Sequence, residues 1–441
     1  MPAFFNRILI MFRLEHISGI DHSIILTNLE SAGSGVPNIP IVSEFSQPII
    51  KGADSMFTYP HNHPEIREAV AKLCGNFDGK YWQACDADRA YPSEFVKALT
   101  DAGYLSALIP EEYGGLSLPI SAGAAILEEI HRTGGNAAAC HAQMYTMGTV
   151  LRHGSDAQKA QYLPGIANGS LRLQAFGVTE PTSGTDTTAL RTTARRDDDI
   201  YVVNGQKVWT SRAEYSDLLL LLARTTPIEQ CAKKTDGLSV FLVDMRKVRG
   251  KSLTITPIRT MMNHSSTQLF FDDMRIPVSS LVGEEGKGFR YILSGMNAER
   301  ILIAAECIGD AKWFIEKASS YSNDRNVFGR PIGQNQGIQF PIARAYSQMR
   351  AAELMLQEAI RLYEAGENPG EEANLSKMLC ADASWAAAEM CVQTFGGFGF
   401  AEEYDVERKF REARLYQVAP ISTNLILSYV AEHVLNLPRS Y

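Results

Sequence analysis

The chain has 441 residues, 45% of them hydrophobic and 21% charged, which is the composition of a soluble globular protein with two or three domains. Asp and Glu number 50 against 42 Lys and Arg, and the resulting net charge of −8 argues against nucleic acid as a partner, because phosphate binding needs a basic surface. No apolar run reaches the roughly 18 residues of a membrane span, so we expect no membrane partner.

The chain begins with a segment that carries little structural signal. Residues 1–55 mix short apolar runs with Gly, Ser and Pro, and we expect a poorly structured extension, with a targeting or accessory segment as the open alternative. From residue 56 to 172 apolar residues recur at helical spacing, with Pro92-Ser93 as one helix start and Thr133-Gly134-Gly135 as one helix end. These residues predict an N-terminal helical domain.

Residues 173–284 change to a period of two, which predicts a central antiparallel β domain. Asn204-Gly205 lies between the alternating segments 201–203 and 207–209, and this pattern predicts a hairpin turn. The other strand candidates are 218–223, 238–243 and 267–271.

Residues 285–441 return to the helical period, and we expect a C-terminal four-helix bundle. Breaks fall near 328–333, 366–370 and 396–399. The glycine-rich break at 396–399 follows a helix and not a strand, so it predicts a helix end rather than a dinucleotide-binding turn. The order of helices, strands and helices predicts an α+β fold.

Glu299 occupies an unusual place on the helix that begins near Gly288. It falls on the apolar stripe of that helix, three residues after Met296 and four before Ile303. A carboxylate on an interior face is costly unless it is paired or neutral, so its pKa should rise toward that of a general base working near neutral pH. A salt bridge to an arginine is the other interpretation, and the local pattern leaves both open. The other members of the stripe are Phe289, Ile292, Leu293, Cys307 and Phe314.

Two polar segments could contact a ligand. Residues 178–186 are rich in Thr, Ser and Gly, so backbone N–H groups and hydroxyls there could approach a phosphate or a flavin edge. Trp209 could cover an aromatic ligand, but it could equally cap the β core. The loop 324–330, which contains Arg325 and Arg330, is either solvated or binds an anion.

The cysteines and histidines suggest neither a disulfide scaffold nor a metal. The seven cysteines are odd in number and form no C-x-x-C pair, which favours a reducing compartment. The nine histidines show no spacing typical of ligands, so we expect no structural metal. Bacterial cytoplasm and mitochondrion both fit this sequence.

Several separated motifs over residues 57–437 resemble the acyl-CoA dehydrogenase family. They are Phe176 to Asp186, Asn204 to Trp209, Asn297-Ala298-Glu299-Arg300, Arg325 to Arg330, and Gln393 to Gly397. The resemblance implies FAD as cofactor, an acyl-CoA substrate, an electron-transfer flavoprotein as acceptor, and a homotetramer or homodimer acting in fatty acid β-oxidation and lipid metabolism.

The resemblance also implies roles for individual residues. On the flavin ring side it places Phe176, Val178, Thr179, Thr185, Trp209 and Ser211, with further FAD contacts from Ser422 and Asn424. The residues that would reach the FAD of a neighbouring subunit are Arg325, Phe328, Gln336, Gln393, Gly396 and Gly397. Those implied for the acyl-CoA are Thr185, Asn297 and Arg300.

The catalytic base depends on which family pattern the chain follows. Many members carry it in a Tyr-Glu-Gly-Thr turn, but here Pro420 occupies the carboxylate's place, and proline can neither take a proton nor donate an N–H. Long-chain and isovaleryl-type members instead use a Glu on the bundle helix, which matches Glu299. The resemblance then implies that Glu299 takes the α proton while the β hydrogen passes as hydride to flavin N5.

Two other uses of the same fold remain open. One is an oxidase or monooxygenase that uses O2, and the other is a flavoprotein with a mainly binding role. The acidic charge balance and the retained Glu299 argue against the second. Neither the length nor the branching of the acyl chain can be read from the sequence, nor whether CoA or a carrier protein holds the thioester.

Overall fold

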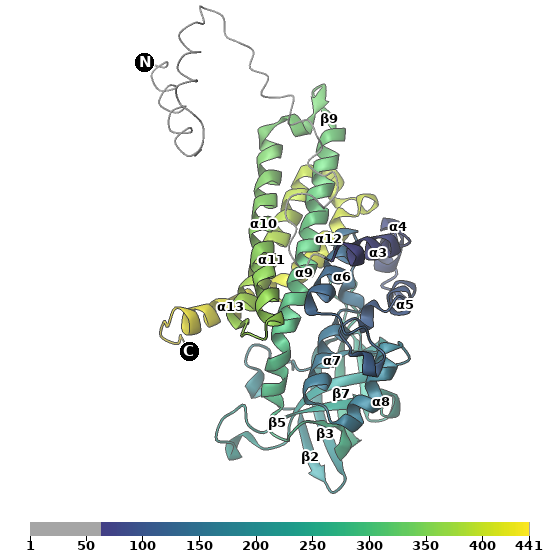
Figure 1. The fold of residues 1–441 in the computed structure, drawn as a ribbon, viewed down its shortest axis with the longest axis vertical. Coiled ribbons are helices and arrows are strands. Elements are labelled where there is room, and N and C mark those ends of the chain that lie inside the picture. Colours follow the sequence, from purple (N-terminus) through teal and green to yellow (C-terminus); the bar gives the residue numbers. More distant parts are fainter. Residues whose placement is uncertain (1–62, 441) are drawn as a thin grey trace, which may run out of the picture. The chain divides into compact units, whose positions relative to one another are not determined.

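The computed structural model describes residues 63–440. The predicted extension 1–55 and the first residues of the predicted helical domain, 56–62, lie outside the described residues. In the described part the chain forms a helical segment, then a mostly antiparallel sheet, then long helices (Figure 1). The predicted fold class is therefore confirmed.

α6 is buried along almost its whole length and packs against α3 of the N-terminal part. α6 lies against the long helix α9, so the two ends of the described chain share one hydrophobic core. α8 begins with a capping box in which Ser155 and Gln158 satisfy each other's backbone N–H groups. The helices are α3 (Pro64–Cys74), α4 (Gly79–Ala87), α5 (Ser93–Asp101), α6 (Ile120–Arg132), α7 (Ala142–His153) and α8 (Asp156–Ala167).

The sheet has the strand order β6-β7-β3-β2-β4-β5-β8, with β1 paired to β4. β1 and β2 run parallel to β4, and the other strand pairs are antiparallel. The sheet therefore combines parallel and antiparallel pairing around β4. Every residue of β4 and β5 is buried, which explains why these strands read as continuous apolar runs. The strands are β1 (Leu173–Gly177), β2 (Thr193–Asp197), β3 (Ile200–Ser211), β4 (Leu218–Arg224), β5 (Leu238–Asp244), β6 (Leu253–Pro257), β7 (Ser266–Pro277) and β8 (Leu281–Val282).

The side chains of β4 point alternately into two cores. Leu218, Leu220 and Leu222 pack with residues of α7 and α8 and with Ile292 at the start of α9. The alternate residues, Leu219 and Leu221 among them, face β3 and β7. The sheet thereby packs against helices on one face, and its strands form a second core on the other.

The predicted hairpin at Asn204-Gly205 is wrong. These residues lie inside the continuous strand β3, where the pairing with β7 shifts register between Val203 and Gly205, and Gly205 has φ 144°. A Cβ at Gly205 would meet Thr192 at 2.6 Å, so glycine serves a bulge and a close approach of chains here. The turn that joins β2 to β3 falls earlier, at Asp198, which has φ 51°.

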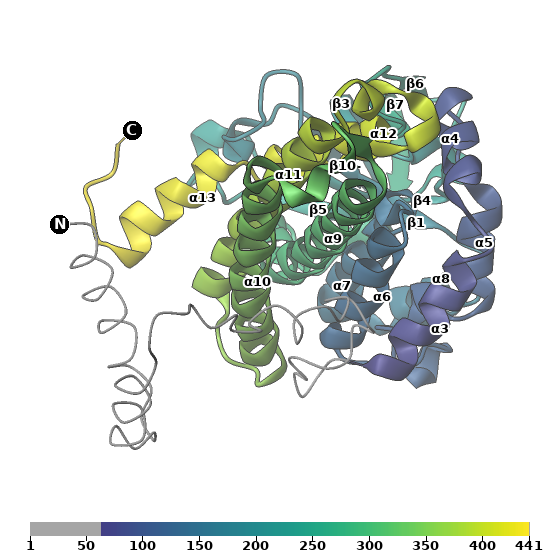
Figure 2. The same ribbon diagram turned by 90° about the horizontal axis from the view of Figure 1, so that it is seen from above.

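The C-terminal part is built on the long helices α9 (Gly288–Asp324), α10 (Gln336–Glu364) and α11 (Gly370–Phe395). Figure 2, viewed along their length, shows them side by side, and α9 is buried through its middle. A short hairpin of β9 (Asn326–Val327) and β10 (Arg330–Pro331) joins α9 to α10, and the chain continues after α11 through α12 (Val406–Ala413) and α13 (Thr423–Tyr429). No helix within residues 63–440 is long and apolar enough to cross a membrane.

Candidate functional site

Glu299 lies inside the protein on α9, as the stripe predicts. Its side chain is 6% exposed, and its helical neighbours Ile292 and Ile303 are buried as well. Leu293 is exposed, so the predicted stripe is wrong at that one position. The carboxyl therefore sits in an apolar region where its charge is poorly solvated.

Burial raises the pKa of Glu299 from its ordinary value to about 7, against opposing effects of Arg300, Tyr145 and Lys377 that lower it. Arg300 acts through its charge, Tyr145 through a side-chain hydrogen bond, and Lys377 through its charge. The charge of Arg300 lowers the pKa of Glu299, as the salt-bridge interpretation expects, but this effect is smaller than the rise that burial causes. A carboxyl with a pKa near 7 can exchange a proton at neutral pH.

Lys377 acts through its charge on Glu299 and also binds the turn around Pro420. The Lys377 side chain is fully buried on α11, and its ammonium donates to the carbonyl oxygens of Tyr416 and Ile421, both at 2.6 Å. Burial lowers the pKa of Lys377. The turn around Pro420 is therefore held by α11, the same helix whose Lys377 acts on Glu299.

The loop 178–186 is held against β3 by a buried ion pair. Lys207 Nζ lies 2.8 Å from Glu180 Oε1 and donates to the Val178 carbonyl at 2.9 Å, while Glu180 accepts the backbone N–H groups of Arg191 and Thr192. Burial lowers the pKa of Lys207 to about 8, against the raising effect of Glu180. This pair fixes the start of the loop, while Thr185 and Gly184 further along it are exposed.

Trp209 and Ser211 end β3 beside this loop. The Val208 N–H donates to the Thr179 carbonyl at 2.9 Å, which joins the two segments. Trp209 is 57% exposed and has φ 61°, so its indole does not cap the β core. Phe176 and Val178, from the end of β1, are half-buried and pack in the same cluster as the start of α9.

The end of β3 also faces the interior around Glu299. Arg212, next to Ser211, is buried, and its charge acts on the phenols of Tyr145 and Tyr416. Its Nη2 lies 3.0 Å from Nδ1 of His264. The structure therefore brings together the end of β3, α7, α9, α11 and the turn before α13.

The residues present fit a flavin. Within the described chain, Thr210 Oγ1, Gln417 Nε2 and Thr423 Oγ1 are buried without a hydrogen-bond partner, and they lie in or beside two of the predicted FAD segments. Buried polar atoms without partners in the protein are where a polar ligand is expected. Ser422 caps α13 by accepting from the Leu425 N–H at 3.3 Å, and Asn424 is exposed.

A second group of predicted FAD residues lies at the other end of the bundle. Arg325 ends α9 and its guanidinium lies 5.4 Å from the ring centre of Phe398, while Phe328, at the tip of the β9–β10 hairpin, is fully exposed. At a rise of 1.5 Å per residue, Glu299 and Arg325 are about 39 Å apart along α9, so this second group lies far from Glu299 within one chain. The remaining members of this group, Gln336, Gln393, Gly396 and Gly397, are also exposed.

The predicted substrate residues divide between two places. Asn297 Oδ1 accepts a hydrogen bond from Arg300 Nη1 at 2.9 Å, next to Glu299, and Arg300 Nε is buried without a partner in the described chain. Thr185 comes from the exposed loop on the sheet side. The described structure does not show a contact between Thr185 and the α9 pair.

A second carboxylate on α9, Glu306, anchors a buried polar cluster behind the site. Glu306 binds His141 Nδ1 at 2.7 Å and accepts from the Tyr416 hydroxyl at 2.7 Å. His131 Nε2 lies 3.6 Å away and its Nδ1 binds Asp310 at 2.8 Å. Burial would raise the pKa of Glu306, but His141 and His131 bring it below its ordinary value. We interpret this cluster as structural.

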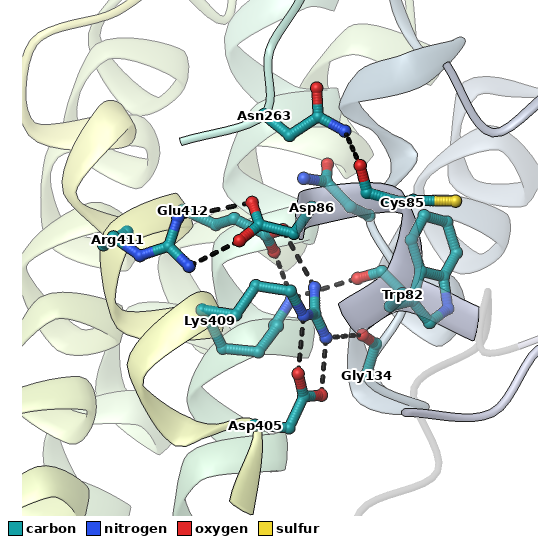
Figure 3. Close-up of polar contacts among 12 residues, drawn as sticks. Trp82, Cys85, Asp86, Gly134, Asn263, Asp405, Lys409, Arg411 and Glu412 are labelled. Carbon is teal, nitrogen blue, oxygen red and sulfur yellow. Dashed lines mark hydrogen bonds and ion pairs between the residues drawn. The ribbon is translucent and has the colours of Figure 1, made fainter. Parts of the chain in front are cut away.

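The cluster continues into α12, where it ties the helices together (Figure 3). Lys409 pairs with Asp310 and donates to the Gly135 carbonyl, and Arg408 bridges Asp405, Glu412 and the Gly134 carbonyl. Arg411 pairs with Asp86 of α4 at 2.6 Å. Within residues 63–440, no group of three or more His, Cys, Asp and Glu side chains is arranged to hold a metal ion.

Sequence reasoning missed Tyr145 and Lys377. Tyr145 falls on α7 and Lys377 on α11, and neither spacing nor composition marks them, because their roles depend on helices distant in the chain. The one local signal is that His141 and Tyr145 are four residues apart, and therefore share one helix face.

Comparisons with known proteins agree on one family. The models titled acyl-CoA dehydrogenase N-terminal, middle and C-terminal domain match residues 60–170, 175–274 and 286–435. Acyl-CoA dehydrogenase FadE12 of Mycobacterium tuberculosis (strain ATCC 25618 / H37Rv) is 34% identical over 391 residues, covering 88% of this chain and 100% of that protein. Cyclohex-1-ene-1-carbonyl-CoA dehydrogenase of Syntrophus aciditrophicus (strain SB) is 34% identical, over 80% of this chain and 84% of its own.

A solved structure shows the same arrangement of domains. Glutaryl-coenzyme A dehydrogenase in its glutaryl-CoA complex superposes with a TM-score of 0.79 at 26% identity, covering 87% of this chain and 98% of that one.

Proposed function

Because this chain belongs to the acyl-CoA dehydrogenase family of flavin-dependent oxidoreductases, we propose that it converts an acyl-CoA thioester to the trans-2-enoyl-CoA, with Glu299 as general base. The observation that carries this proposal is the buried carboxyl of Glu299, whose pKa burial raises to about 7. It lies on α9 beside the segments that the resemblance assigns to the flavin.

Glu299 removes the α proton of the substrate. That C–H bond is weakly acidic because the thioester carbonyl stabilises the resulting negative charge. A base is most effective when its pKa lies near the working pH, and a carboxyl of ordinary pKa would be too weak. Burial supplies the shift, while Arg300 and Lys377 keep enough of the anion populated at neutral pH.

A bound FAD would supply the acceptor for the β hydrogen, which leaves as a hydride. Thr179, Trp209 and Ser211 would hold its ring side, with Ser422 and Asn424 contacting it from the segment before and within α13. The exposed group that includes Arg325 and Phe328 reaches the FAD of a second copy in a homotetramer or homodimer. The separation of about 39 Å along α9 supports two flavin contacts per chain rather than one.

The substrate carbonyl needs a hydrogen-bond donor as negative charge develops on its oxygen. Pro420 has no N–H, so Ile421 offers the next backbone donor in the turn that Lys377 holds. Asn297, Arg300 and Thr185 contact the acyl-CoA. An electron-transfer flavoprotein takes up the electrons, as expected for an enzyme of fatty acid β-oxidation.

The test is flavin bleaching by acyl-CoA in the Glu299→Gln variant. Butyryl-CoA, octanoyl-CoA and isovaleryl-CoA are each mixed anaerobically with FAD-loaded protein, and the flavin absorbance is followed. We expect the variant to retain FAD and to be reduced at least about 1,000-fold more slowly than wild type by the substrate that wild type uses best.

The matched control is Glu316→Gln on the same helix. The pKa of Glu316 is also raised by burial, but this residue faces Arg132 and lies away from the site. Glu316→Gln should bleach like wild type. Normal bleaching in Glu299→Gln would remove Glu299 as the base.

A further inference from the structure

Tyr145 is the hydroxyl-bearing side chain of α7 that faces Glu299. The two residues are 154 positions apart in the chain, so their pairing depends on how α7 packs against α9. That packing is fixed by contacts on both sides of the pair.

The first contact holds the start of α7. His141 Nδ1 lies 2.7 Å from Glu306 Oε1, and both side chains are buried. At the other end, His153 Nε2 lies 2.8 Å from Ser294 Oγ, and the His153 ring stacks on Tyr291 with centroids 4.3 Å apart. Residue numbers rise along α7 while they fall along α9, so the two helices are antiparallel in this region.

Between these two contacts the helices approach closely. A Cβ at Gly295 would lie 3.4 Å from Thr149 Oγ1 and 3.2 Å from the Arg152 guanidinium. Tyr145 falls between His141 and Thr149 on α7, and Glu299 falls between Glu306 and Gly295 on α9. The antiparallel register therefore brings these two residues to the same level.

We propose, on the basis of the proposed function above, that Tyr145 is a positioning residue whose hydroxyl donates a hydrogen bond to Glu299 and holds its carboxylate in the orientation for proton removal. The tyrosine ring is half-buried against the hydrophobic core, which limits its movement. A carboxylate held by one donor loses fewer orientations on reaching the substrate than a free side chain does.

The charged groups around the pair fit this role. Arg300 of α9, Tyr145 of α7 and Lys377 of α11 all face Glu299. Arg212 and Glu306 act in turn on the Tyr145 phenol, whose pKa burial and then Glu299 raise well above its ordinary value. The phenol therefore stays protonated and remains a donor at every pH at which the enzyme would work.

The test is Tyr145→Phe, which keeps the ring and removes the hydroxyl. Flavin reduction is measured against pH in FAD-loaded enzyme, with the acyl-CoA that wild type oxidises best and with its α-deuterated form. Wild type should gain rate as the pH rises through about 7, where Glu299 loses its proton. In Tyr145→Phe this limb should move upward by about one pH unit, because a donor to the carboxylate is lost.

Two further readouts separate positioning from packing. At pH 7 the variant should be reduced about five- to tenfold more slowly, with a larger deuterium isotope effect, because proton removal becomes more rate-limiting. The control is Tyr162→Phe on α8, whose hydroxyl lies near Asp244 and Arg246 and not near Glu299. It should match wild type in pH profile and isotope effect.

The proposal would be overturned if the rate of flavin reduction in Tyr145→Phe rose over the same pH range as in wild type, whether or not the rate itself is lower. A packing defect slows the reaction without changing the pKa of the base. Glu299→Gln distinguishes this failure from that of the proposed function. If acyl-CoA bleaches the flavin of Glu299→Gln normally, the general base is another group. If Glu299→Gln is not bleached but the pH limb of Tyr145→Phe stays at its wild-type position, only the positioning role of Tyr145 is refuted.

Discussion

Two buried carboxyl groups on α9, those of Glu299 and Glu306, have pKa values shifted in opposite directions. Glu299 and Glu306 are seven residues apart, which is about two helical turns, and both are buried. Burial raises the pKa of Glu299 to about 7, whereas the partners of Glu306 bring its pKa below the ordinary value.

The difference comes from hydrogen bonds and charge partners, because burial opposes ionisation at both positions. Glu306 binds His141 and the Tyr416 hydroxyl directly, with His131 close by, so its charge is compensated. Glu299 has the Tyr145 hydroxyl and the charges of Arg300 and Lys377, which together do not offset its desolvation. Burial thus makes a reactive carboxyl only where compensation is incomplete.

The largest effect on stability should come from removing the charge of Glu306. Glu306→Gln should destabilise the folded protein by about 3 to 5 kcal/mol, because it leaves the buried histidine cluster without its anion. Glu299→Gln should change the free energy of unfolding at pH 7 by less than about 1 kcal/mol, or stabilise the protein, since it removes a poorly compensated buried carboxyl. Equilibrium urea unfolding of FAD-loaded protein measures both. Equal losses in the two variants would contradict the comparison.

The stability that each carboxyl contributes, measured as the difference in unfolding free energy between wild type and its Gln variant, should change with pH in opposite directions at the two positions. The folded-state pKa of Glu299 is raised from 4.5 to about 7, so the stability from its protonated form is present below the unfolded pKa and is lost as the pH rises through about 7. Relative to Glu299→Gln, wild type should lose on the order of 3 kcal/mol between about pH 4.5 and about pH 8.

Glu306 should behave in the opposite way. Its pKa is lowered in the folded state, so its contribution is present above the unfolded pKa and is lost as the pH falls through the folded pKa. The penalty of Glu306→Gln should therefore shrink in acid. Urea midpoints at a series of pH values would show it, and a penalty that grows in acid would refute the assignment of Glu306 as an anion.

A smaller loss of stability than that of Glu306→Gln should follow from removing one donor of Glu306. Tyr416→Phe deletes the hydroxyl that binds this carboxylate at 2.7 Å, and should lower the free energy of unfolding by about 1.5 to 2 kcal/mol. The Tyr416 carbonyl, which accepts from Lys377, is unchanged. The acid limb of flavin reduction should stay at its wild-type position, in contrast to Tyr145→Phe. A shift of that limb would mean that the two carboxylates are coupled.

Much of the fold could be predicted from periodicity. The apolar runs of β4 and β5 and the helix ends near Thr133 and Gly396 appear where local patterns place them. The hairpin at Asn204-Gly205 was wrong because the same dipeptide suits a bulge, and only the pairing of β3 with β7 decides between the two.

The site was accessible to the same reasoning only in part. Glu299 could be found because one charged residue interrupts an apolar stripe, which is a local feature of a single helix. Tyr145, Lys377 and Arg212 could not, because each is identified only by the residues that it faces on other elements of the interior. Their roles arise from contacts between α7, α9, α11 and the end of β3.

The sequence by itself determined that a carboxylate would be carried inward on α9, since helical spacing fixes which face a residue occupies. The tertiary structure alone decided how that carboxylate would ionise. The pKa of Glu299 depends on the dielectric around it and on the distances to Tyr145, Arg300 and Lys377, and these follow from the packing of helices that are remote in the chain.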